Sequence, residues 1–465
     1  MRKKNIIFFL TDQQHFRTIR ENGCPEAQTP NMDSLAREGI NFQNHYVTNP
    51  VCSPSRGAIW TGLYPSENGL YGNGCTLPES ETTLPMVLQD DGYRTGHFGK
   101  LHLEPTVTHG TTHKHFGFET CSIAEGDQYL THDDYNLWLR EKDPHAFFQY
   151  YHQMAEEGHA KAYVANIPEE LSLNAWVTEQ SIGWMQETAA ADQPFFLSMG
   201  YFDPHHAWNP CEPYATEFAF REVSPPKYDP QDMAKKPSLW EEWGPARDPF
   251  NISAIIRSYH AMVAHLDDCL GRLIAALEQA GQLENTVIVF SSDHGEFLGN
   301  HGRLFKGPYL CDDLLRVPMI IWDGAQRNTV KGKTDALTSS LDFFPTIQSL
   351  AGIAEIAESR GIRMVDTDLG LTPDGERECV ISEWRMHPDT GAATDDILSV
   401  RTKGERYVRY ATTGEEEYYQ HREDPFELDN RSGETGTKEQ RERLRKLLEE
   451  HGPQRGSWPP PTAPW

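Results

Sequence analysis

Short apolar runs alternate with amphipathic stretches over the first two thirds of the chain. Runs rich in β-forming residues are Ile6–Leu10, Tyr93–Phe98, Phe195–Phe202, Thr286–Ser292 and Val317–Trp322. The run at 286–292 is nearly continuous in apolar residues, which is typical of a strand covered on both faces of a sheet. This alternation predicts an α/β fold: a large doubly wound, mostly parallel sheet sandwiched by helices.

Two helices can be delimited from the pattern alone. Thr29 and Pro30 open one of them as N-cap and first turn, and Gly39 ends it. Between Ile255 and Leu277, apolar residues recur at spacings of three and four, which predicts one face of a long amphipathic helix.

The pattern changes after about residue 365. Ile397–Arg401, Arg406–Tyr410 and Glu416–Gln420 are typical of short antiparallel strands, and a charged helix follows over 437–450. We therefore predict a large domain at 1–365 and a small α+β domain at 366–465. Its Pro-rich tail contains Trp458 and Trp465, and packing of this tail on a neighbouring subunit would explain them, so a homo-oligomer stays open.

Charge excludes several kinds of partner. Of the 465 residues, 42 are Lys or Arg and 69 are Asp or Glu, giving a formal charge of −27. A surface this acidic repels phosphate backbones, so we expect no nucleic-acid and no membrane partner. An anionic substrate would need a local cationic pocket that opposes the overall field.

Cysteine usage and the N-terminus bear on the compartment. The apolar stretch within the first ten residues is too short for a signal peptide and lacks a small-residue cleavage site, so we expect a cytoplasmic protein. The eight cysteines are scattered without a CxxC pair, which favours reduced thiols over a disulfide framework.

The segment Cys52–Arg56, with the sequence CSPSR, places a cysteine at the expected start of a helix. Free N–H groups and the positive end of the helix dipole lower the pKa of a thiol there, which makes Cys52 a candidate nucleophile. The ordinary alternative is a buried cysteine beside a helix cap.

This segment resembles the sulfatase signature C-x-P-x-R, and other motifs of that family follow in chain order, ending with a D-P-x-E-x-x-N turn within Glu417–Asn430. The chain is therefore similar to the type I sulfatases of the alkaline-phosphatase superfamily. The resemblance implies an alkaline-phosphatase-like fold with a sulfatase catalytic domain at 1–365. It also implies that a maturation enzyme oxidises Cys52 to formylglycine, whose hydrate is the nucleophile, and that Arg56 holds the modified side chain.

The resemblance further implies a divalent metal. Its ligands would be Asp12 and Gln13 after the first strand, Asp293 and His294 after a later one, and residue 52 itself. Many sulfatases have a second Asp where Gln13 stands, so one negative charge is absent. An oxygen-rich set favours Ca²⁺ or Mg²⁺, while an imidazole leaves room for Mn²⁺; we expect Ca²⁺.

Cationic groups for a sulfate are also implied. Gly99–His102 matches the family motif G-K-x-H, in which Lys100 would bind sulfate oxygens and His102 would take a proton from residue 52. His205 would contact sulfate and protonate the leaving oxygen. Ala207 replaces the proline of the family's P-H-x-P segment, and Lys306 would clamp the sulfate.

The implied reaction hydrolyses a sulfate monoester of an aryl or carbohydrate alcohol. With Asp293 as base, the hydrate attacks sulfur and His205 protonates the departing alcohol. Elimination assisted by His102 then releases sulfate and restores the aldehyde.

Several other residues are weaker candidates. Asn73 is either a pocket residue or a plain turn. The tryptophans compatible with aryl or sugar substrates are Trp208, Trp240 and Trp243. Two further residues that could contact substrate are Arg385 and His387. The histidines interpreted as loop residues rather than metal ligands are His109, His113 and His115.

Two alternatives remain open. A phosphonate monoester or phosphodiester hydrolase of the same superfamily would share the formylglycine and the metal site. Lys100 and His102 favour sulfate, because those relatives tend to carry Thr or Tyr there. The second alternative is an inactive relative that binds metal and anions, in which Cys52 is never modified.

Overall fold

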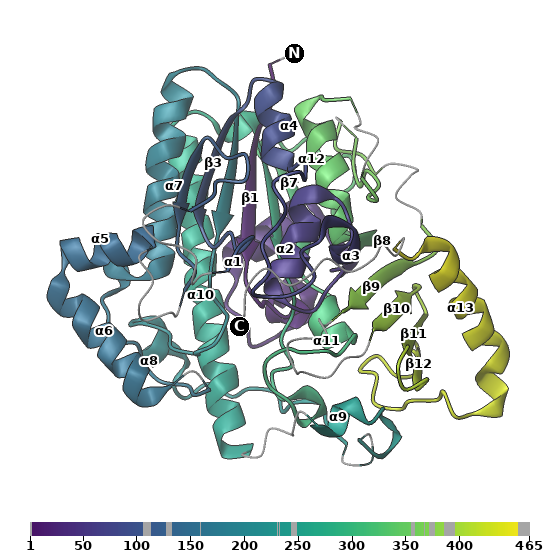
Figure 1. Cartoon of the computed structure of the whole chain (residues 1–465). Helices are drawn as coiled ribbons and strands as arrows, with labels where there is room; N and C mark the ends of the chain where they lie inside the picture. The colour runs from purple at the N-terminus through teal and green to yellow at the C-terminus, as the bar shows by residue number, and fades with distance from the viewer. Residues whose placement is uncertain are drawn as a thin grey trace.

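The computed structural model describes most of the chain: residues 2–105, 113–126, 133–158, 160–229, 231, 233–242, 249–354, 359–366, 368–371, 377–385 and 396–453. Within these residues a large mixed sheet forms the centre of the molecule, and a smaller antiparallel sheet lies beside it (Figure 1). The predicted fold class is confirmed.

The large sheet has the strand order β4-β3-β5-β1-β6-β7-β2-β8 in the described part of the chain. The strands are β1 Asn5–Thr11, β2 Ile40–Tyr46, β3 Arg94–Gly99, β4 Thr120–Ile123, β5 Phe195–Gly200, β6 Thr286–Ser292, β7 Met319–Asp323 and β8 Gly332–Ser339. Only β7 runs antiparallel to its neighbours among these strands. The carboxyl ends of the others therefore meet at one edge, where such sheets bind ligands.

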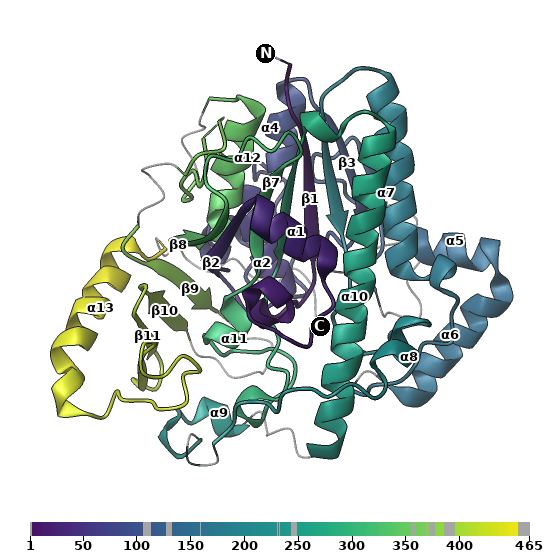
Figure 2. The same ribbon diagram turned by 180° about the vertical axis from the view of Figure 1, so that it is seen from behind.

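Helices cover both faces of this sheet (Figures 1 and 2). Alternation along β1 explains why: Ile7 and Phe9 pack into one core cluster, and Ile6 and Phe8 pack into the other. The first cluster is covered by α1 Pro30–Glu38, α7 Leu173–Ala190 and α10 Pro249–Gln279; the second by α2 Cys52–Thr61, α4 Leu84–Asp90 and α12 Phe343–Ala351.

Shorter elements complete the large domain. The helices α5 and α6 project at one side of the molecule (Figure 1). The remaining helices here are α3 Pro65–Asn68, α5 Asp134–Lys142, α6 Pro144–Glu157, α8 Tyr214–Phe218, α9 Leu239–Glu242 and α11 Asp312–Leu315. Single 3₁₀ turns are η1 Phe16–Thr18, η2 Arg20–Asn22, η4 Glu169–Leu171, η5 Met233–Lys235, η6 Leu283–Asn285, η7 Asn300–Gly302, η8 Ser340–Asp342 and η11 Thr435–Thr437, the last near the C-terminal helix.

The small sheet has the order β12-β11-β10-β9 and is antiparallel. It consists of β9 Val380–Trp384, β10 Ile397–Arg401, β11 Glu405–Tyr410 and β12 Glu416–Gln420, and α13 Lys438–His451 packs on it through Leu444 and Leu448. Glu427, from the D-P-x-E-x-x-N turn, accepts hydrogen bonds from Arg406 Nε (2.5 Å) and from the backbone N–H of Asp312 (2.8 Å). This carboxylate therefore ties the small sheet to α11. The boundary at residue 365 stays a prediction.

Several expected elements differ in detail from the structure. The bounds of β6, β10 and β12 are those predicted, and α1 starts at Pro30 and ends before Gly39. The Thr29 side chain does not cap α1, because its hydroxyl is used by the N–H of Arg20 and by Asp33. The run predicted at 317–322 contains a strand that lies at Met319–Asp323 and is antiparallel to its neighbours. Strands β2, β4, β8 and β9 were not predicted; in β2 and β8 polar residues outnumber apolar ones.

The eight cysteines all lie in the described residues and form no disulfide, as expected from their spacing. None of the described helices combines the length and the apolar character needed to cross a membrane. The tail beyond residue 453 lies outside the described residues, so the expected contact with a neighbouring subunit stays a prediction.

A buried histidine in β3 gives a testable pH dependence. His97 is fully buried, 3.0 Å from Ser198 Oγ, and burial lowers its pKa to about 3. Below about pH 6.5 the imidazole of His97 takes up a proton in the unfolded chain but not in the folded chain. The free energy of unfolding therefore decreases by about 1.4 kcal/mol for each unit by which the pH is lowered. In urea denaturation, the stability of wild type relative to His97→Gln should fall by about 2.5 kcal/mol between pH 6 and pH 4. A relative stability that stays constant with pH would contradict the assignment.

Candidate active site

Side chains at the carboxyl ends of neighbouring strands converge on the start of α2. Asp12 follows β1, Lys100 follows β3, His205 follows β5 and Asp293 follows β6, and all four are buried. Cys52, the first residue of α2, is 1% exposed and lies among them. The structure thus brings together groups that are far apart in sequence.

The start of α2 is held by a side chain from outside the helix. Val51 is in extended conformation and cannot cap it, but Asn73 Oδ1 accepts a hydrogen bond from the N–H of Ser53 at 3.0 Å. This bond satisfies one of the free N–H groups of the first turn. Asn73 lies in a turn, its side chain supports the helix that bears Cys52, and its place in a substrate pocket stays a prediction.

The Cys52 sulfur is surrounded by polar side chains. Its contacts are Lys306 Nζ (3.0 Å), His294 Nε2 (3.2 Å), Lys100 Nζ (3.8 Å) and Asp12 Oδ1 (3.8 Å), and the side chains of His102 and His205 also lie close to it. Burial alone would raise the pKa of this thiol, but the charges of Lys100, Lys306 and His294 hold it well below its usual value. An anion at this point is therefore stabilised inside a strongly acidic protein.

Arg56 links the ends of three strands. Its Nε donates to Asp293 Oδ2 at 2.7 Å, its Nη1 to the carbonyl oxygen of Lys100 at 2.5 Å, and its Nη2 to Asp12 Oδ2 at 3.4 Å. Lys100 Nζ is 2.6 Å from Asp12 Oδ2. Burial would raise the pKa of Asp12, but cationic neighbours, Lys100 first among them, hold it below its ordinary range. Asp12 is thus kept as a carboxylate.

A group of donor atoms fits a divalent cation. Asp12, Cys52, Asp293 and His294 each offer one donor atom, all within 4.8 Å of one another. His294 Nδ1 lies 2.9 Å from the carbonyl oxygen of Gly295, so that nitrogen carries a proton and Nε2 faces the other donors. Two carboxylates and an imidazole nitrogen suit Ca²⁺ or Mn²⁺.

Gln13 lies at the edge of this group. Its N–H donates to Asp293 Oδ1 at 3.0 Å, and its Oε1 accepts from Lys306 Nζ at 2.8 Å. Gln13 and His102 both have left-handed backbone, with φ of 63° and 54°. Such conformations cost roughly 1–3 kcal/mol in residues other than glycine and cluster at functional sites.

A second cluster of metal-type residues has a different explanation. Donor atoms of Asp312, His421 and Glu427 also lie within 4.8 Å of one another. Arginines already neutralise them: Arg406 Nε is 2.5 Å from Glu427 and Arg401 Nε is 3.3 Å from Asp312. This cluster is an ion-pair network between the two sheets.

Some residues at the site were not predicted. Glu296 accepts from the amide of Gln13, and burial raises its pKa to about 7. Glu125 Oε1 accepts from the N–H of His102 at 2.8 Å, and the Phe202 ring lies 4.8 Å from Lys100 Nζ. Glu296 could have been suspected, because it follows the Asp-His-Gly segment directly.

The tryptophan prediction is wrong for the two that are described. Trp208 and Trp240 are fully buried, and Trp208 stacks on Phe305 with 5.3 Å between ring centroids. Neither can stack on a substrate without leaving the core. Trp243 lies outside the described residues.

The weaker candidates have mixed outcomes. Arg385 lies 3.4 Å from Asp396, next to the small sheet. His113 lies 3.0 Å from Asp134, so this histidine is paired with a single carboxylate. His387 and His109 lie outside the described residues.

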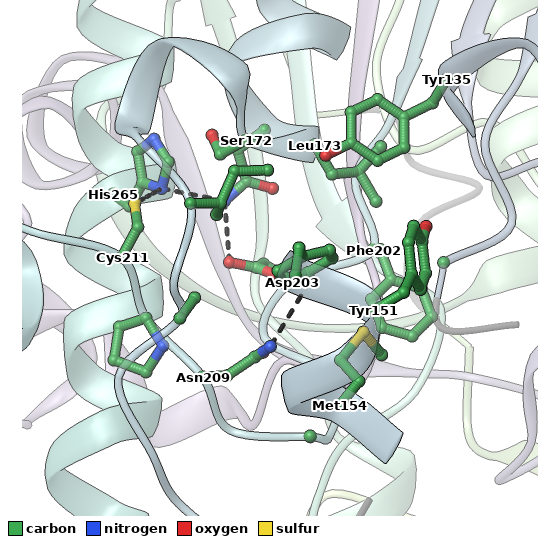
Figure 3. A pocket seen from close by; sticks show the side chains of 17 residues that line it. Tyr135, Tyr151, Met154, Ser172, Leu173, Phe202, Asp203, Asn209, Cys211 and His265 are labelled. Atoms are coloured by element: carbon green, nitrogen blue, oxygen red, sulfur yellow. Dashed lines mark hydrogen bonds between the residues drawn. The ribbon is translucent and has the colours of Figure 1, made fainter. Parts of the chain in front are cut away.

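A pocket adjoins the site on the side of α5 and α6 (Figure 3). Phe202 and Asp203, which follow β5, line it together with Tyr135, Tyr151 and Met154. Asp203 Oδ2 accepts from Asn174 Nδ2 at 2.7 Å, and burial raises the pKa of Asp203 to about 6. The pocket and the cationic site share Phe202, whose ring also lies 4.6 Å from that of His205.

Comparison with known proteins agrees with this geometry. A family model described as Sulfatase matches residues 4–353. The chain belongs to the sulfatase family. A second model, N-sulphoglucosamine sulphohydrolase, C-terminal, matches residues 299–454. Membership of the sulfatase family supports the predicted enzyme class, a sulfuric ester hydrolase. It does not specify the alcohol part of the substrate.

Relatives of this sulfatase cover nearly the whole chain. An arylsulfatase from Clostridium perfringens is 29% identical, over 96% of this chain and 94% of its own. A solved structure of a protein bound to its substrate, D-glucosamine-2-N,6-O-disulfate, superposes on this chain with a TM-score of 0.74 at 23% identity. The match covers 96% of this chain and 97% of that chain. A phosphonate monoester hydrolase from Silicibacter pomeroyi has a TM-score of 0.84 at 20% identity, covering 97% and 95%. These two structures show the same fold.

Proposed function

We propose that this sulfatase hydrolyses a sulfate monoester of an aryl or carbohydrate alcohol, with a formylglycine made from Cys52 as nucleophile. The observation that supports this most is the cationic surrounding of residue 52, where Lys100 and Lys306 stabilise an anion within a chain of charge −27. A maturation enzyme would convert Cys52. The sulfur marks where the oxygens of the hydrated aldehyde would lie.

Asp12, Gln13, Asp293 and His294 would hold a divalent cation together with residue 52. The donor set favours Ca²⁺, with Mn²⁺ or Mg²⁺ as the alternatives. Once bound, the cation would polarise a sulfate oxygen and favour the ionised hydrate.

The chain's own groups divide the remaining work. Lys100 and Lys306 would bind sulfate oxygens and offset the charge that grows on them in the transition state. His205 would give its proton to the leaving alcohol oxygen. Burial and Lys306 lower the pKa of His205 in the free protein, and the negative charge of a bound sulfate would favour its protonated form.

Two further groups act on residue 52 itself. Asp293, placed by Arg56 and by the N–H of Gln13, would take the proton from the hydrated residue as it attacks sulfur. His102, which lies close to the same side chain, would take the second proton, so that sulfate leaves and the aldehyde is restored.

A phosphonate monoester is the second candidate substrate, and the phosphonate monoester hydrolase with a TM-score of 0.84 is compatible with it. That likeness concerns the fold alone. A sulfate monoester and a phosphonate monoester both place one anionic tetrahedral group between Lys100 and Lys306, so their relative rates must decide.

Turnover of an aryl sulfate and a phenyl phosphonate ester should be compared on the same metal-loaded preparation. We expect the sulfate to have the higher kcat/KM, and Lys100→Ala to lower it by about 10²–10³-fold through loss of a buried charge at the transferring group. Lys114→Ala, at an exposed lysine, is the control. A faster phosphonate reaction would reverse the assignment of substrate.

A further inference from the structure

The contacts of the Gln13 side chain allow one orientation of its amide. Its Nε2 donates to Glu296 Oε2 and lies 3.2 Å from His206 Nδ1. Its Oε1 accepts from Lys306 Nζ at 2.8 Å. The reversed amide would turn its NH₂ toward the ammonium of Lys306 and its oxygen toward the carboxylate of Glu296, so both contacts would become repulsive.

Glu296 is itself fixed in place. It is fully buried, and its Oε1 accepts from the N–H of Leu298 (3.2 Å) and of Phe305 (2.5 Å). Its Oε2 is left for Gln13. The Glu296 carboxylate therefore links three segments: Gln13 after β1, its own loop after β6, and the backbone of Phe305, which directly precedes Lys306.

An amide needs such a partner more than a carboxylate does. Either oxygen of an aspartate can ligate a cation, whereas an amide presents its oxygen in only one of two orientations. The reversed amide would point two N–H groups at the cation. A glutamine at a metal site therefore needs an acceptor behind it to hold the NH₂ away.

We propose that Glu296 is a positioning residue that holds the Gln13 amide with its oxygen toward the metal. The inference rests on the metal of the proposed function. It adds that the Gln13 oxygen, held in place by Glu296, supplies the ligand here where many sulfatases have a second aspartate.

Glu296→Gln tests this with a side chain of the same shape. The new side chain keeps its oxygen on the N–H groups of Leu298 and Phe305, so its NH₂ faces Gln13. Gln13 must then turn and present its own NH₂ to the cation. We expect the affinity for Ca²⁺ and for Mn²⁺, measured by calorimetry on the full chain, to fall about 10–100-fold.

The exchanged pair separates orientation from loss of structure. In Gln13→Glu combined with Glu296→Gln, the carboxylate at position 13 accepts from the new amide and still offers an oxygen to the cation. We expect this double variant to recover most of the lost affinity. Glu383→Gln is the matched control, because Glu383 is also buried and accepts a backbone N–H, from Ser66 at 2.7 Å, away from Gln13.

The outcomes are distinguishable. Thermal unfolding in EDTA reports folding of each variant, and calorimetry reports the cation separately from turnover. Wild-type affinity in Glu296→Gln, or a double variant that binds no better than that single variant, would overturn the inference alone. Binding of neither cation by wild-type protein would overturn the metal of the proposed function and this inference with it.

Discussion

Cys52→Ala should lower kcat toward an aryl sulfate by about 10⁶-fold, as removal of a covalent nucleophile does in other hydrolases. Residue 52 is the side chain on which Lys100 and Lys306 converge, where they would bind the sulfate that it attacks. The substitution removes one sulfur from a buried position, and the fold should persist. Steady-state kinetics and thermal unfolding, measured on the same sample, check both parts.

Mass spectrometry of the peptide that contains residue 52 shows directly whether Cys52 has been converted to formylglycine. Conversion replaces the sulfur by oxygen, so active protein should contain the lighter aldehyde form. Cys379→Ala, at a buried cysteine beside the small sheet, is the matched control and should keep its turnover. Appreciable turnover by Cys52→Ala would refute the formylglycine mechanism, and an entirely unmodified thiol in active-site peptides would favour an inactive binding relative.

Arg56→Met should cost about 3–5 kcal/mol of unfolding free energy, because it leaves the buried carboxylate of Asp293 without its cation. Arg56 is fully buried and contacts both Asp12 and Asp293. The same change should abolish turnover, since these carboxylates would repel each other and lose their alignment. Urea denaturation in EDTA measures the first effect without any contribution from a bound cation.

Arg406→Met separates stability from function. Arg406 is also fully buried and pairs with Glu427 and Asp312, but in the network between the two sheets. We expect a similar loss of stability with turnover retained at temperatures where the variant is folded. Equal loss of turnover in both variants would show that Arg56 acts on activity only through the stability of the fold.

The site illustrates how an acidic protein can hold an anion. The overall charge of −27 repels sulfate at long range, but salt screens that repulsion beyond about 10 Å. Within the site, Lys100 and Lys306 are direct neighbours of residue 52, at 3.8 and 3.0 Å from its sulfur. Short contacts in a buried place therefore outweigh a larger but more distant negative charge.

Sequence alone determined the elements whose signals are local. Strand β6 and helix α1 were placed from apolar runs and from Pro30 and Gly39, because strand and helix periods and helix ends depend on neighbouring residues. The motif residues, from Asp12 to Lys306, could likewise be selected by residue type and spacing. The direction of β7 could not, since both directions use the same apolar pattern.

Tertiary structure decided the contacts between segments distant in sequence. It buries Trp208 instead of exposing it to substrate. It brings Asn73 Oδ1 to the N–H of Ser53, and it places Glu296 beside the amide of Gln13. These outcomes depend on how loops from different strand ends meet at one edge of the sheet. Periodicity along a chain cannot predict these contacts between loops. It indicates which face of a helix or strand is buried, but not which side chain of another segment packs against that face.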